Sequence, residues 1–340
     1  MRRFAVATVC ALLVLGLPTA VLGQAKQSWA QAEIKLVTGR GLMGGNPASF
    51  KPEAPLTRRA LDDLVAGLTE MPSPATGPST THVTLTGLHQ ALVRGLGLGD
   101  EARNFSQAAR ASGLTPPARF GGEVVARLLG LRKNHPAAAD HLELLPNDVA
   151  TRAEAAYSAA KVLRFHGGET EAIELAASEF ELPQYHPWQR KVLQTAVRLI
   201  GYPYVWGGAS DGFQTLFGIA SRGGFDCSGF VWQVFKLERY EGGEALAQTL
   251  RGRTAAQMAG EVPRVGRIPF GKLQPADVMY FGPGGRRAPA AEIDHAGIYL
   301  GNGWMINSSR SGVALAPVVG WHEERFAWGR RPLAEAGLVS

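Results

Sequence analysis

The sequence predicts an α+β protein in which a helical N-terminal region precedes a domain that combines helices with an antiparallel sheet. Over residues 28–165, helix-forming stretches alternate with glycine stops and loops that contain proline. Over residues 295–307, two short β-type runs flank Gly301-Asn302-Gly303, a pattern typical of a hairpin. The length of 340 residues leaves room for two domains and a substantial core.

The chain begins with a segment typical of protein export. Met1-Arg2-Arg3 is followed by an almost entirely apolar or small stretch from Phe4 to Val21. A short charged region before a short apolar core predicts a secretory signal over residues 1–25, cleaved after Gly23 or Ala25. The alternative is an uncleaved anchor, because the apolar core is near the short end of a membrane span.

Composition and charge narrow the possible partners. The hydrophobic share of 45% and the charged share of 19% are ordinary for a globular protein, and the formal net charge is +6. A positive balance suits an anionic environment such as a cell-wall polymer or lipid headgroups, without choosing between them. No basic run is interleaved with aromatic residues, so the sequence does not suggest a nucleic-acid partner.

Helix boundaries can be placed in the N-terminal region. Residues 32–37 predict a helix that stops at Gly39-Arg40-Gly41. Thr57 is placed to cap a second helix, whose apolar face includes Leu61 and Leu64. Thr151, with Glu154 three residues later, predicts a capping box at the start of another helix. Together with the rhythm of glycine stops and proline loops, these starts indicate a faint internal repeat.

This region resembles S-layer homology repeats. The best matches are Phe50-Lys51-Pro52 with Leu56-Thr57-Arg58, and Thr151-Arg152-Ala153-Glu154. We expect about three copies over residues 28–165, with Gly121-Gly122-Glu123 standing where the middle copy would carry its helix-start motif.

The resemblance implies that these repeats bind cell-wall polysaccharide. In the family, loop arginines contact the polymer, and the matching positions here are Arg58 and Arg152. The alternative is that both are solvated arginines at helix starts. Residues 166–187 predict a connecting helix and a linker, after which a second domain runs over residues 188–332.

Cys227 is the feature of the second domain that most needs a chemical explanation. It is the only cysteine outside the predicted signal, whereas an exported chain normally pairs its cysteines. It can be a small core residue, half of an intermolecular disulfide, or a nucleophile. Phe230, Val231 and Val234 follow at helical spacing, which places Cys227 in the first turn of a helix. The helix dipole and free N–H groups stabilise a thiolate there.

A base for this thiol is predicted at His295, at the start of the hairpin. If Leu300 pairs with Trp304, then Asn307 lies opposite Gly297 on the face that carries His295. A two-residue Asn-Gly turn instead shifts the register by one and puts Asn307 on the other face. The first register completes a nucleophile, a base and an orienting amide.

The second domain resembles the NlpC-type papain-like cysteine peptidases of bacterial cell walls. Six blocks occur in the family's order. They are Tyr204-Val205-Trp206-Gly207-Gly208, Phe225-Asp226-Cys227-Ser228-Gly229-Phe230, Arg253-Thr254 with Gln257, Leu273-Gln274-Pro275-Ala276-Asp277-Val278, His295-Ala296-Gly297-Ile298-Tyr299-Leu300-Gly301, and Arg330-Arg331.

The resemblance implies a papain-like fold, with the cysteine helix packed on an antiparallel sheet, and a secreted hydrolase at the cell wall or cell surface. Cys227 would attack a peptidoglycan stem-peptide amide, His295 would act as the base, and Asn307 would be the third polar residue. The favoured bond joins D-glutamate to the diamino acid. Neither a metal nor a cofactor is expected, and the sequence does not indicate an oligomeric state. The alternatives are an amidase or acyltransferase on the same fold, or a non-catalytic wall-binding protein.

Three further residues take roles by resemblance. Tyr204 would donate its hydroxyl near the oxyanion or the cysteine, and Asp226 and Ser228 would line the substrate side, as in relatives that bind a free stem-peptide amine. Residues 209–224 are longer and richer in glycine than the family's usual link. This stretch forms either a rim that narrows substrate choice or a tolerated surface insertion.

Overall fold

The computed structural model describes residues 28–70, 72 and 80–339 of the chain. The predicted signal over residues 1–25 lies outside the described residues. Within the described ranges, no helix has both the length and the apolar character needed to span a membrane.

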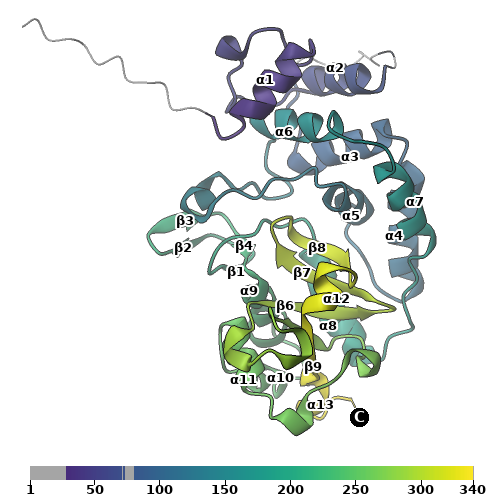
Figure 1. Cartoon of the computed structure of the whole chain (residues 1–340), viewed down its shortest axis with the longest axis vertical. Helices are drawn as coiled ribbons and strands as arrows, with labels where there is room; N and C mark the ends of the chain where they lie inside the picture. The colour runs from purple at the N-terminus through teal and green to yellow at the C-terminus, as the bar shows by residue number, and fades with distance from the viewer. Residues whose placement is uncertain (1–27, 71, 73–79, 340) are drawn as a thin grey trace, which may run out of the picture.

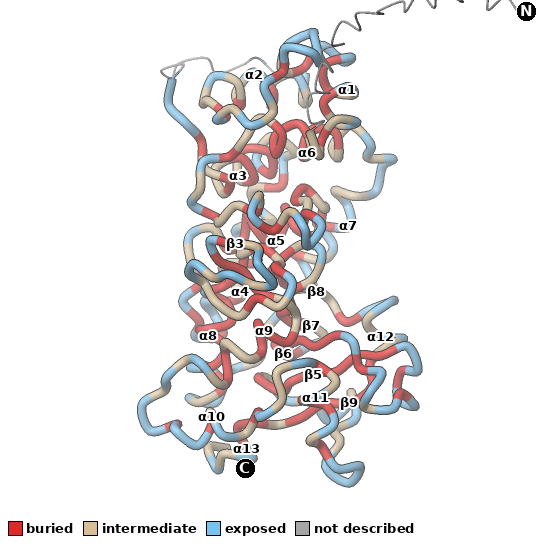
Figure 2. Tube along the Cα trace, turned by 90° about the vertical axis from the view of Figure 1, so that its left-hand side faces the viewer, coloured by how far each residue is buried: buried red, intermediate tan, exposed pale blue. Residues whose placement is uncertain are grey.

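The molecule is elongated, with a helical region at one end and a sheet-containing domain at the other (Figure 1). The predicted α+β class is therefore confirmed. The helical region comprises α1 (Gln31–Gly39), α2 (Arg58–Thr69), α3 (Leu85–Gly95), α4 (Gly99–Ala111), α5 (Phe120–Leu128) and α6 (Arg152–Val162), and α7 (Glu169–Ser178) is the predicted connecting helix. Buried residues run along α3, α5 and α6 and continue into the sheet (Figure 2).

Three short extended segments meet at the centre of the helical region. The Leu56 N–H donates to the Ala150 carbonyl at 2.8 Å, the Ala150 N–H to the Val83 carbonyl at 2.8 Å, and the Val83 N–H to the Leu56 carbonyl at 2.9 Å. The three bonds form a closed ring, so each segment is both donor and acceptor to the others. Helices α2, α3 and α6 begin directly after these segments.

Each of these three helices is capped by a threonine. Thr57, Thr84 and Thr151 all accept a hydrogen bond from the backbone N–H three residues later. Thr84 is therefore a third capped helix start, whereas Gly121-Gly122-Glu123 lie in the first turn of α5, which begins at Phe120 without a side-chain cap. The predicted capping box at Thr151 is only half formed. Glu154 donates its N–H but turns its carboxylate into the buried core.

Helix α5 joins the helical region to the second domain. Arg119 donates to the carbonyls of Arg198 at 2.5 Å and Ile200 at 2.9 Å, and Arg127 donates to the carbonyl of Gly201 at 2.7 Å. These carbonyls lie at and just beyond the end of α8 (Pro187–Arg198), where a helix leaves acceptors without partners. The two arginines thus satisfy carbonyls that the helix itself leaves without donors.

The second domain is built on an antiparallel sheet with strand order β8-β7-β6-β5-β9. Its central strands are buried along their whole length, because α9 packs on one face and a smaller apolar cluster around Met279 and Phe281 covers the other. The strands are β5 (Val278–Phe281), β6 (His295–Gly301), β7 (Trp304–Ser309), β8 (Gly312–Pro317) and β9 (Phe326–Arg330). The helices are α9 (Cys227–Trp232), α10 (Leu246–Thr249), α11 (Ala255–Gly260), α12 (Trp321–Arg325) and α13 (Pro332–Glu335).

Residues 209–224 fold back on themselves as short strands. The outer hairpin pairs β2 (Gln214–Leu216) with β3 (Ile219–Ser221), and the inner pair is β1 (Ala209–Ser210) with β4 (Gly224–Phe225). The hairpin projects from the domain beside the helical region (Figure 1). There β3 contacts the short helical segment Ala137–Leu142.

Candidate active site

Cys227 is the first residue of α9, as predicted. Asp226 caps this helix by accepting a hydrogen bond from the Gly229 N–H at 2.5 Å. Phe225, the residue before Asp226, is fixed by two hydrogen bonds. Its N–H donates to the Pro203 carbonyl, and its carbonyl accepts from the Ser308 hydroxyl at 2.7 Å. The nucleophile candidate is therefore held between the loop before β1 and strand β7.

The two glycine-containing blocks approach each other too closely for side chains. A Cβ added at Gly229 would lie 1.8 Å from the Gly208 carbonyl oxygen, and one added at Gly208 would lie 2.5 Å from the Gly224 carbonyl oxygen. Only glycine fits at these positions. This contact explains in physical terms why glycines occupy both places beside the cysteine.

The β6–β7 hairpin combines features of both registers considered from the sequence. Asn302 and Gly303 form a two-residue turn with φ of 49° and 79°. Gly301 therefore pairs with Trp304, as the two-residue turn requires, and Leu300 does not. A bulge at Leu300 then shifts the ladder back by one residue.

The expected opposition of Gly297 and Asn307 is confirmed because of that bulge. His295 lies two residues before Gly297, so its side chain shares a face with Asn307. Nε2 of His295 lies 3.2 Å from Oδ1 of Asn307, and both side chains are buried. The absence of a side chain at Gly297 leaves room for this contact. A Cβ added at Gly297 would lie only 3.2 Å from the Asn307 Cβ and would crowd the asparagine.

Sγ of Cys227 lies against the start of the strand that carries His295. The thiol donates to the Asp294 carbonyl at 3.8 Å, and α9 packs on β6. Among the described residues, no hydrogen bond joins the sulfur to the imidazole. The structure thus brings Cys227, His295 and Asn307 together, with the thiol beside the backbone at His295.

Burial, followed by the charge of Asp226, raises the pKa of Cys227 to about 12. The sequence led us to expect a thiolate stabilised by the helix start. That expectation was wrong for the resting protein, because the cost of desolvating a thiolate exceeds the benefit of the backbone N–H groups of Ser228 and Ala296.

His295 is also neutral at rest. Burial, with a smaller effect from His322, lowers its pKa to about 4. The His322 ring stacks with that of His295 at a centroid distance of 6.2 Å, and Trp321 meets it edge-on at 5.9 Å. Both neighbours come from α12, whose contribution to the site the sequence patterns did not reveal.

Tyr204 lies half-buried near the thiol. Burial, followed by the proximity of Cys227 and then Asp226, raises the pKa of its hydroxyl. The phenol therefore stays protonated and able to donate across the physiological range. Its backbone is held by a parallel bridge to Phe225, the residue that fixes the start of α9.

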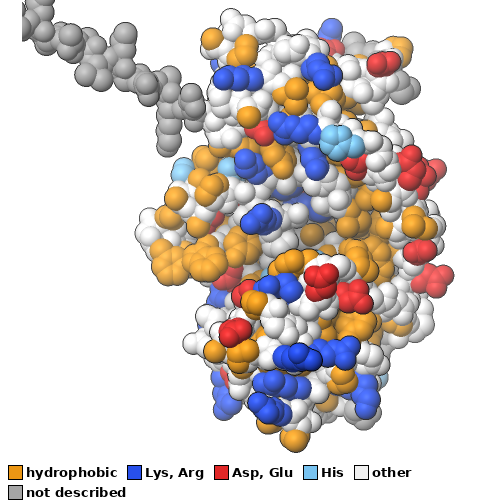
Figure 3. Space-filling model, in the orientation of Figure 1, with side chains coloured by type: hydrophobic (Ala, Val, Ile, Leu, Met, Phe, Trp, Pro, Cys, Tyr) orange, Lys and Arg blue, Asp and Glu red, His pale blue; other side chains and the backbone are white. Residues whose placement is uncertain are grey.

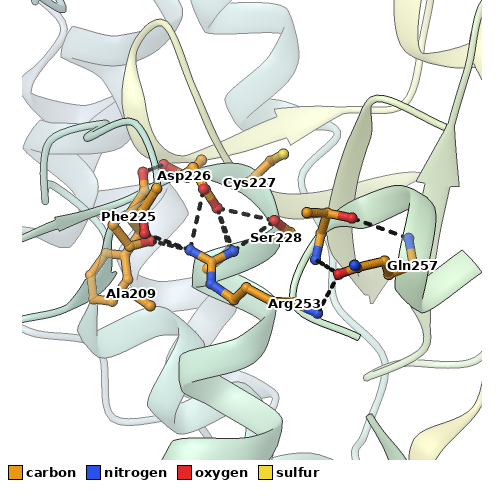
Figure 4. A network of polar contacts seen from close by, with 12 residues as sticks. Ala209, Phe225, Asp226, Cys227, Ser228, Arg253 and Gln257 are labelled. Atoms are coloured by element: carbon orange, nitrogen blue, oxygen red, sulfur yellow. Dashed lines mark hydrogen bonds and ion pairs between the residues drawn. The ribbon is translucent and has the colours of Figure 1, made fainter. Parts of the chain in front are cut away.

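Asp226 and Ser228 flank the cysteine but turn toward Arg253 (Figure 4). The guanidinium donates to Oδ1 of Asp226 at 3.1 Å, to its Oδ2 at 3.2 Å and to the Ser228 hydroxyl at 2.9 Å. It also donates to the carbonyls of Gly207 and Gly208 at 2.8 and 3.0 Å. One arginine thereby ties the tryptophan-glycine block to the cysteine block.

Arg253 lies in one of the six family blocks, but no sequence pattern marked it as a site residue. Its backbone is fixed because Thr254 and Gln257 form a complete capping box at the start of α11. Gln257 accepts from both the Arg253 and Thr254 N–H groups. The signal that could have identified Arg253 is the capping-box spacing directly after it.

The helical region also reaches the edge of the site. Asp140 accepts a hydrogen bond from the Trp206 N–H at 3.2 Å. Burial is the largest of the effects that raise its pKa to about 6. Trp206 is exposed, and the exposed Phe217 of the β2–β3 turn lies over the neighbouring Gly207. An aromatic rim therefore stands beside the tryptophan-glycine block.

The two arginines predicted to bind polymer differ in their surroundings. Arg152 donates to the carbonyls of Phe50 at 2.9 Å and Met43 at 2.8 Å, and its guanidinium lies over the Phe50 ring. It therefore fixes the loop between α1 and α2. Arg58 instead lines a surface pocket of about 410 Å³ together with Arg94.

No group of three or more histidine, cysteine or carboxylate side chains with metal-binding geometry occurs among the described residues.

The last of the six family blocks, Arg330-Arg331, is structural, because Arg331 pairs with the buried Asp277 at 2.9 Å and Arg330 pairs with Glu261 at 2.8 Å.

Two protein-family models match this chain, at the cysteine site and at the start of the helical region. The NlpC/P60 family model matches residues 201–330, and the S-layer homology domain model matches residues 24–60. The first match contains every candidate residue around Cys227. The second contains the loop at Phe50 and the cap at Thr57.

The chain is similar to several curated proteins over the second domain. It is 30% identical over 125 residues to a gamma-D-glutamyl-L-lysine dipeptidyl-peptidase of Bacillus subtilis, covering 36% of this chain and 33% of that protein. It is 35% identical over 127 residues to a probable endopeptidase of Mycobacterium bovis, covering 37% of this chain and 25% of that protein. The chain thus spans about a quarter to a third of these relatives.

Among solved structures, a non-catalytic NlpC/p60 domain protein of Mycobacterium tuberculosis is 21% identical, with a TM-score of 0.32, and the match covers 43% of this chain and 98% of that one. The family matches thus identify an NlpC/P60 domain over residues 201–330, where the structure builds the cysteine site, and an S-layer homology domain over residues 24–60.

Proposed function

We propose that this protein is a secreted peptidoglycan hydrolase that cleaves stem-peptide amide bonds with Cys227 as its nucleophile. The observation that carries the proposal is the His295–Asn307 contact of 3.2 Å, formed on a strand that packs against the start of α9. A cysteine, a neutral imidazole and an orienting amide are the groups that acyl transfer through a thioester needs.

The proposed mechanism begins from a neutral thiol and a neutral imidazole. Because Nε2 of His295 is engaged by Asn307, Nδ1 is the nitrogen left to take the thiol proton as Sγ attacks the amide carbonyl. His295 then protonates the leaving amine, and a thioester remains on Cys227. Water, activated by the same imidazole, releases the acid and restores the thiol.

Two donors support the tetrahedral intermediate. The backbone N–H groups at the start of α9 are not all used within the helix, and the raised pKa of Tyr204 keeps its hydroxyl protonated. Tyr204 is therefore proposed as an oxyanion donor. Asp226 and Ser228 flank the nucleophile on the Arg253 side, and that face is the proposed substrate side.

The proposed bond joins D-glutamate to the diamino acid. The Bacillus subtilis relative named as a gamma-D-glutamyl-L-lysine dipeptidyl-peptidase supports this choice. Amidase or acyltransferase activity on the same fold is the alternative, and the Mycobacterium tuberculosis protein described as non-catalytic gives a third possibility, in which the domain only binds the wall.

The test is digestion of purified peptidoglycan, with mass spectrometry of the new ends. We expect free D-glutamyl carboxylates and free diamino-acid amines with the wild type and neither with Cys227→Ala. Acyl exchange onto an added amine would identify a transferase. Identical products from the two proteins would rule out the hydrolase and leave wall binding.

We further propose that the repeats over residues 28–165 hold the enzyme at the cell surface by binding wall polysaccharide, while residues 188–332 act as the peptidase. Arg58, in its pocket with Arg94, is the better candidate for polymer contact, because the Arg152 guanidinium is already bound to carbonyls. Wall pulldown should weaken with Arg58→Ala but not with Arg59→Ala, its exposed neighbour. Undiminished binding by Arg58→Ala would contradict the assignment.

A further inference from the structure

Four arginines line one surface pocket of the second domain, and none of the residues that line it belongs to the cysteine site. Arg264 and Arg267 come from the turn after α11, and Arg286 and Arg287 come from the connection between β5 and β6. The pocket holds about 580 Å³. Figure 3 shows Lys and Arg side chains gathered over the end of the molecule formed by this domain.

These guanidiniums lack acidic partners within the part of the chain that the structure describes. The nearby carboxylates of Glu261 and Asp294 are taken by Arg330 and Arg325. Glu292, on the same connection as Arg286 and Arg287, is exposed and forms no ion pair with them. Four like charges therefore share one pocket without a protein anion to balance them, which costs free energy unless an external anion is present.

One of the four is held rigidly. The Arg267 guanidinium lies over the Trp328 ring at 3.5 Å, and its Nε is buried without a hydrogen-bond partner. Burial, followed by the charge of Arg264, lowers its pKa. Stacking on an aromatic ring orients the planar donors of arginine, so less entropy is lost when an anion binds.

The number and directions of the donors select among anions. Each guanidinium carries five N–H donors, whereas one planar carboxylate offers about four acceptor sites in a single plane. Donors that come from two separate segments of the chain suit a tetrahedral group better than a planar one. Guanidinium pairs also bind phosphate oxygens in a bidentate way.

We propose that the pocket lined by Arg264, Arg267, Arg286 and Arg287 binds successive phosphate groups of a linear phosphate-containing polyanion. This site is separate from the cysteine site, although the loop bearing Arg286 and Arg287 leads directly into His295. A polymer held there would keep the domain at a phosphate-rich surface independently of the N-terminal repeats.

Binding is tested on the full chain carrying Cys227→Ala, so that the result does not depend on catalysis. Isothermal titration calorimetry with sodium polyphosphate, over a series of salt concentrations, compares this protein with one that also carries Arg264→Gln and Arg286→Gln. The matched control carries Arg239→Gln and Arg310→Gln, which remove the same charge from exposed arginines outside the pocket. All four substituted arginines lack ion-pair partners among the described residues, so unfolding temperatures should stay equal.

We expect the affinity of the pocket variant for polyphosphate to fall about tenfold or more. The plot of log K against log salt should become less steep by about 1.4, because two phosphate contacts are lost at roughly 0.7 each. The control should keep the parent's affinity and slope. Equal loss in both variants, or no loss in either, overturns the proposal.

Two further probes examine the ligand class. Polygalacturonate, a carboxylate polymer, should bind more weakly than polyphosphate, and equal binding overturns the assignment to phosphate.

Val265 is fully exposed between Arg264 and Arg267 and could touch a lipid surface. Capture by phosphatidylglycerol vesicles that is lost with Val265→Ser, while polyphosphate does not bind, would replace the polymer by a membrane. Failure of the peptidoglycan digest leaves all these results unaffected.

Discussion

Oδ1 of Asn307 lies 3.2 Å from Nε2 of His295, and the two residues reach this distance across neighbouring strands of a buried sheet. The contact selects the tautomer of the imidazole, because Nε2 must carry the proton that Asn307 accepts. It leaves Nδ1 as the base.

Removal of the amide at Asn307 should therefore lower kcat more than it raises KM. We expect Asn307→Leu to reduce kcat by about 10- to 10³-fold, less than the roughly 10⁴-fold effect of a wrong tautomer in a serine protease triad. Asn307→His restores an acceptor and should recover most of the loss. Steady-state kinetics on a soluble stem peptide measure both, and equal losses in the two variants would show that packing, not orientation, is affected.

The pH dependence follows from the neutral resting pair. Imidazole can act as a base above its pKa of about 4, and the thiol keeps its proton below its pKa of about 12. The value of kcat/KM should thus rise through pH about 4 and remain flat to pH 9. A decline between pH 7 and 9, with the protein still folded, would instead indicate a preformed thiolate–imidazolium pair.

Alkylation of Cys227 gives an independent measure of the same property. Because iodoacetamide reacts with the thiolate, the rate should keep rising with pH up to pH 10. The background from Cys10 is subtracted with Cys227→Ala. A rate already at its plateau at pH 7 would contradict the raised pKa.

Gly229→Ala should destabilise the domain strongly. The new Cβ would lie 1.8 Å from the Gly208 carbonyl oxygen, so the backbone at the cysteine must move, at a cost of more than about 3 kcal/mol. Gly271 has no atom within 4 Å of its added Cβ, and Gly271→Ala should change stability by less than about 0.5 kcal/mol. Urea unfolding compares the two, and similar free energies would disprove the close approach.

Arg253→Lys should impair both stability and turnover. Lysine keeps the charge but cannot reach Asp226, Ser228 and the two glycine carbonyls together, so we expect a loss of about 1–3 kcal/mol in unfolding free energy. The kcat should fall because the start of α9 shifts. Arg251→Lys, at an exposed neighbour, serves as the control and should leave both unchanged.

Asp140→Asn should stabilise the protein at pH 8 but not at pH 4. The folded-state pKa is raised from 3.8 to about 6, so folding favours the protonated acid. The charged form therefore destabilises the fold above pH 6, and this effect disappears below pH 3.8. Asparagine keeps an acceptor for the Trp206 N–H. Thermal unfolding at both pH values measures the difference, and Asp140→Ala, which leaves that N–H unpaired, should not show the gain.

Local patterns predicted the parts of the site that depend on neighbouring residues. The spacing of Phe230, Val231 and Val234 placed Cys227 at a helix start, and threonines at positions 57 and 151 marked helix caps. Such features follow from hydrophobic periodicity and from hydrogen bonds within a few residues, so the sequence contains enough information to locate them.

Only the tertiary structure decided the features that depend on distant contacts. The bulge at Leu300 reconciles a two-residue turn with the opposition of Gly297 and Asn307, and burial reverses the expected pKa shift of Cys227. Thr84, which no sequence pattern singled out, caps a third helix because its segment closes a ring with two others far along the chain. Register, desolvation and ring closure all arise from packing between segments, which local sequence patterns do not specify.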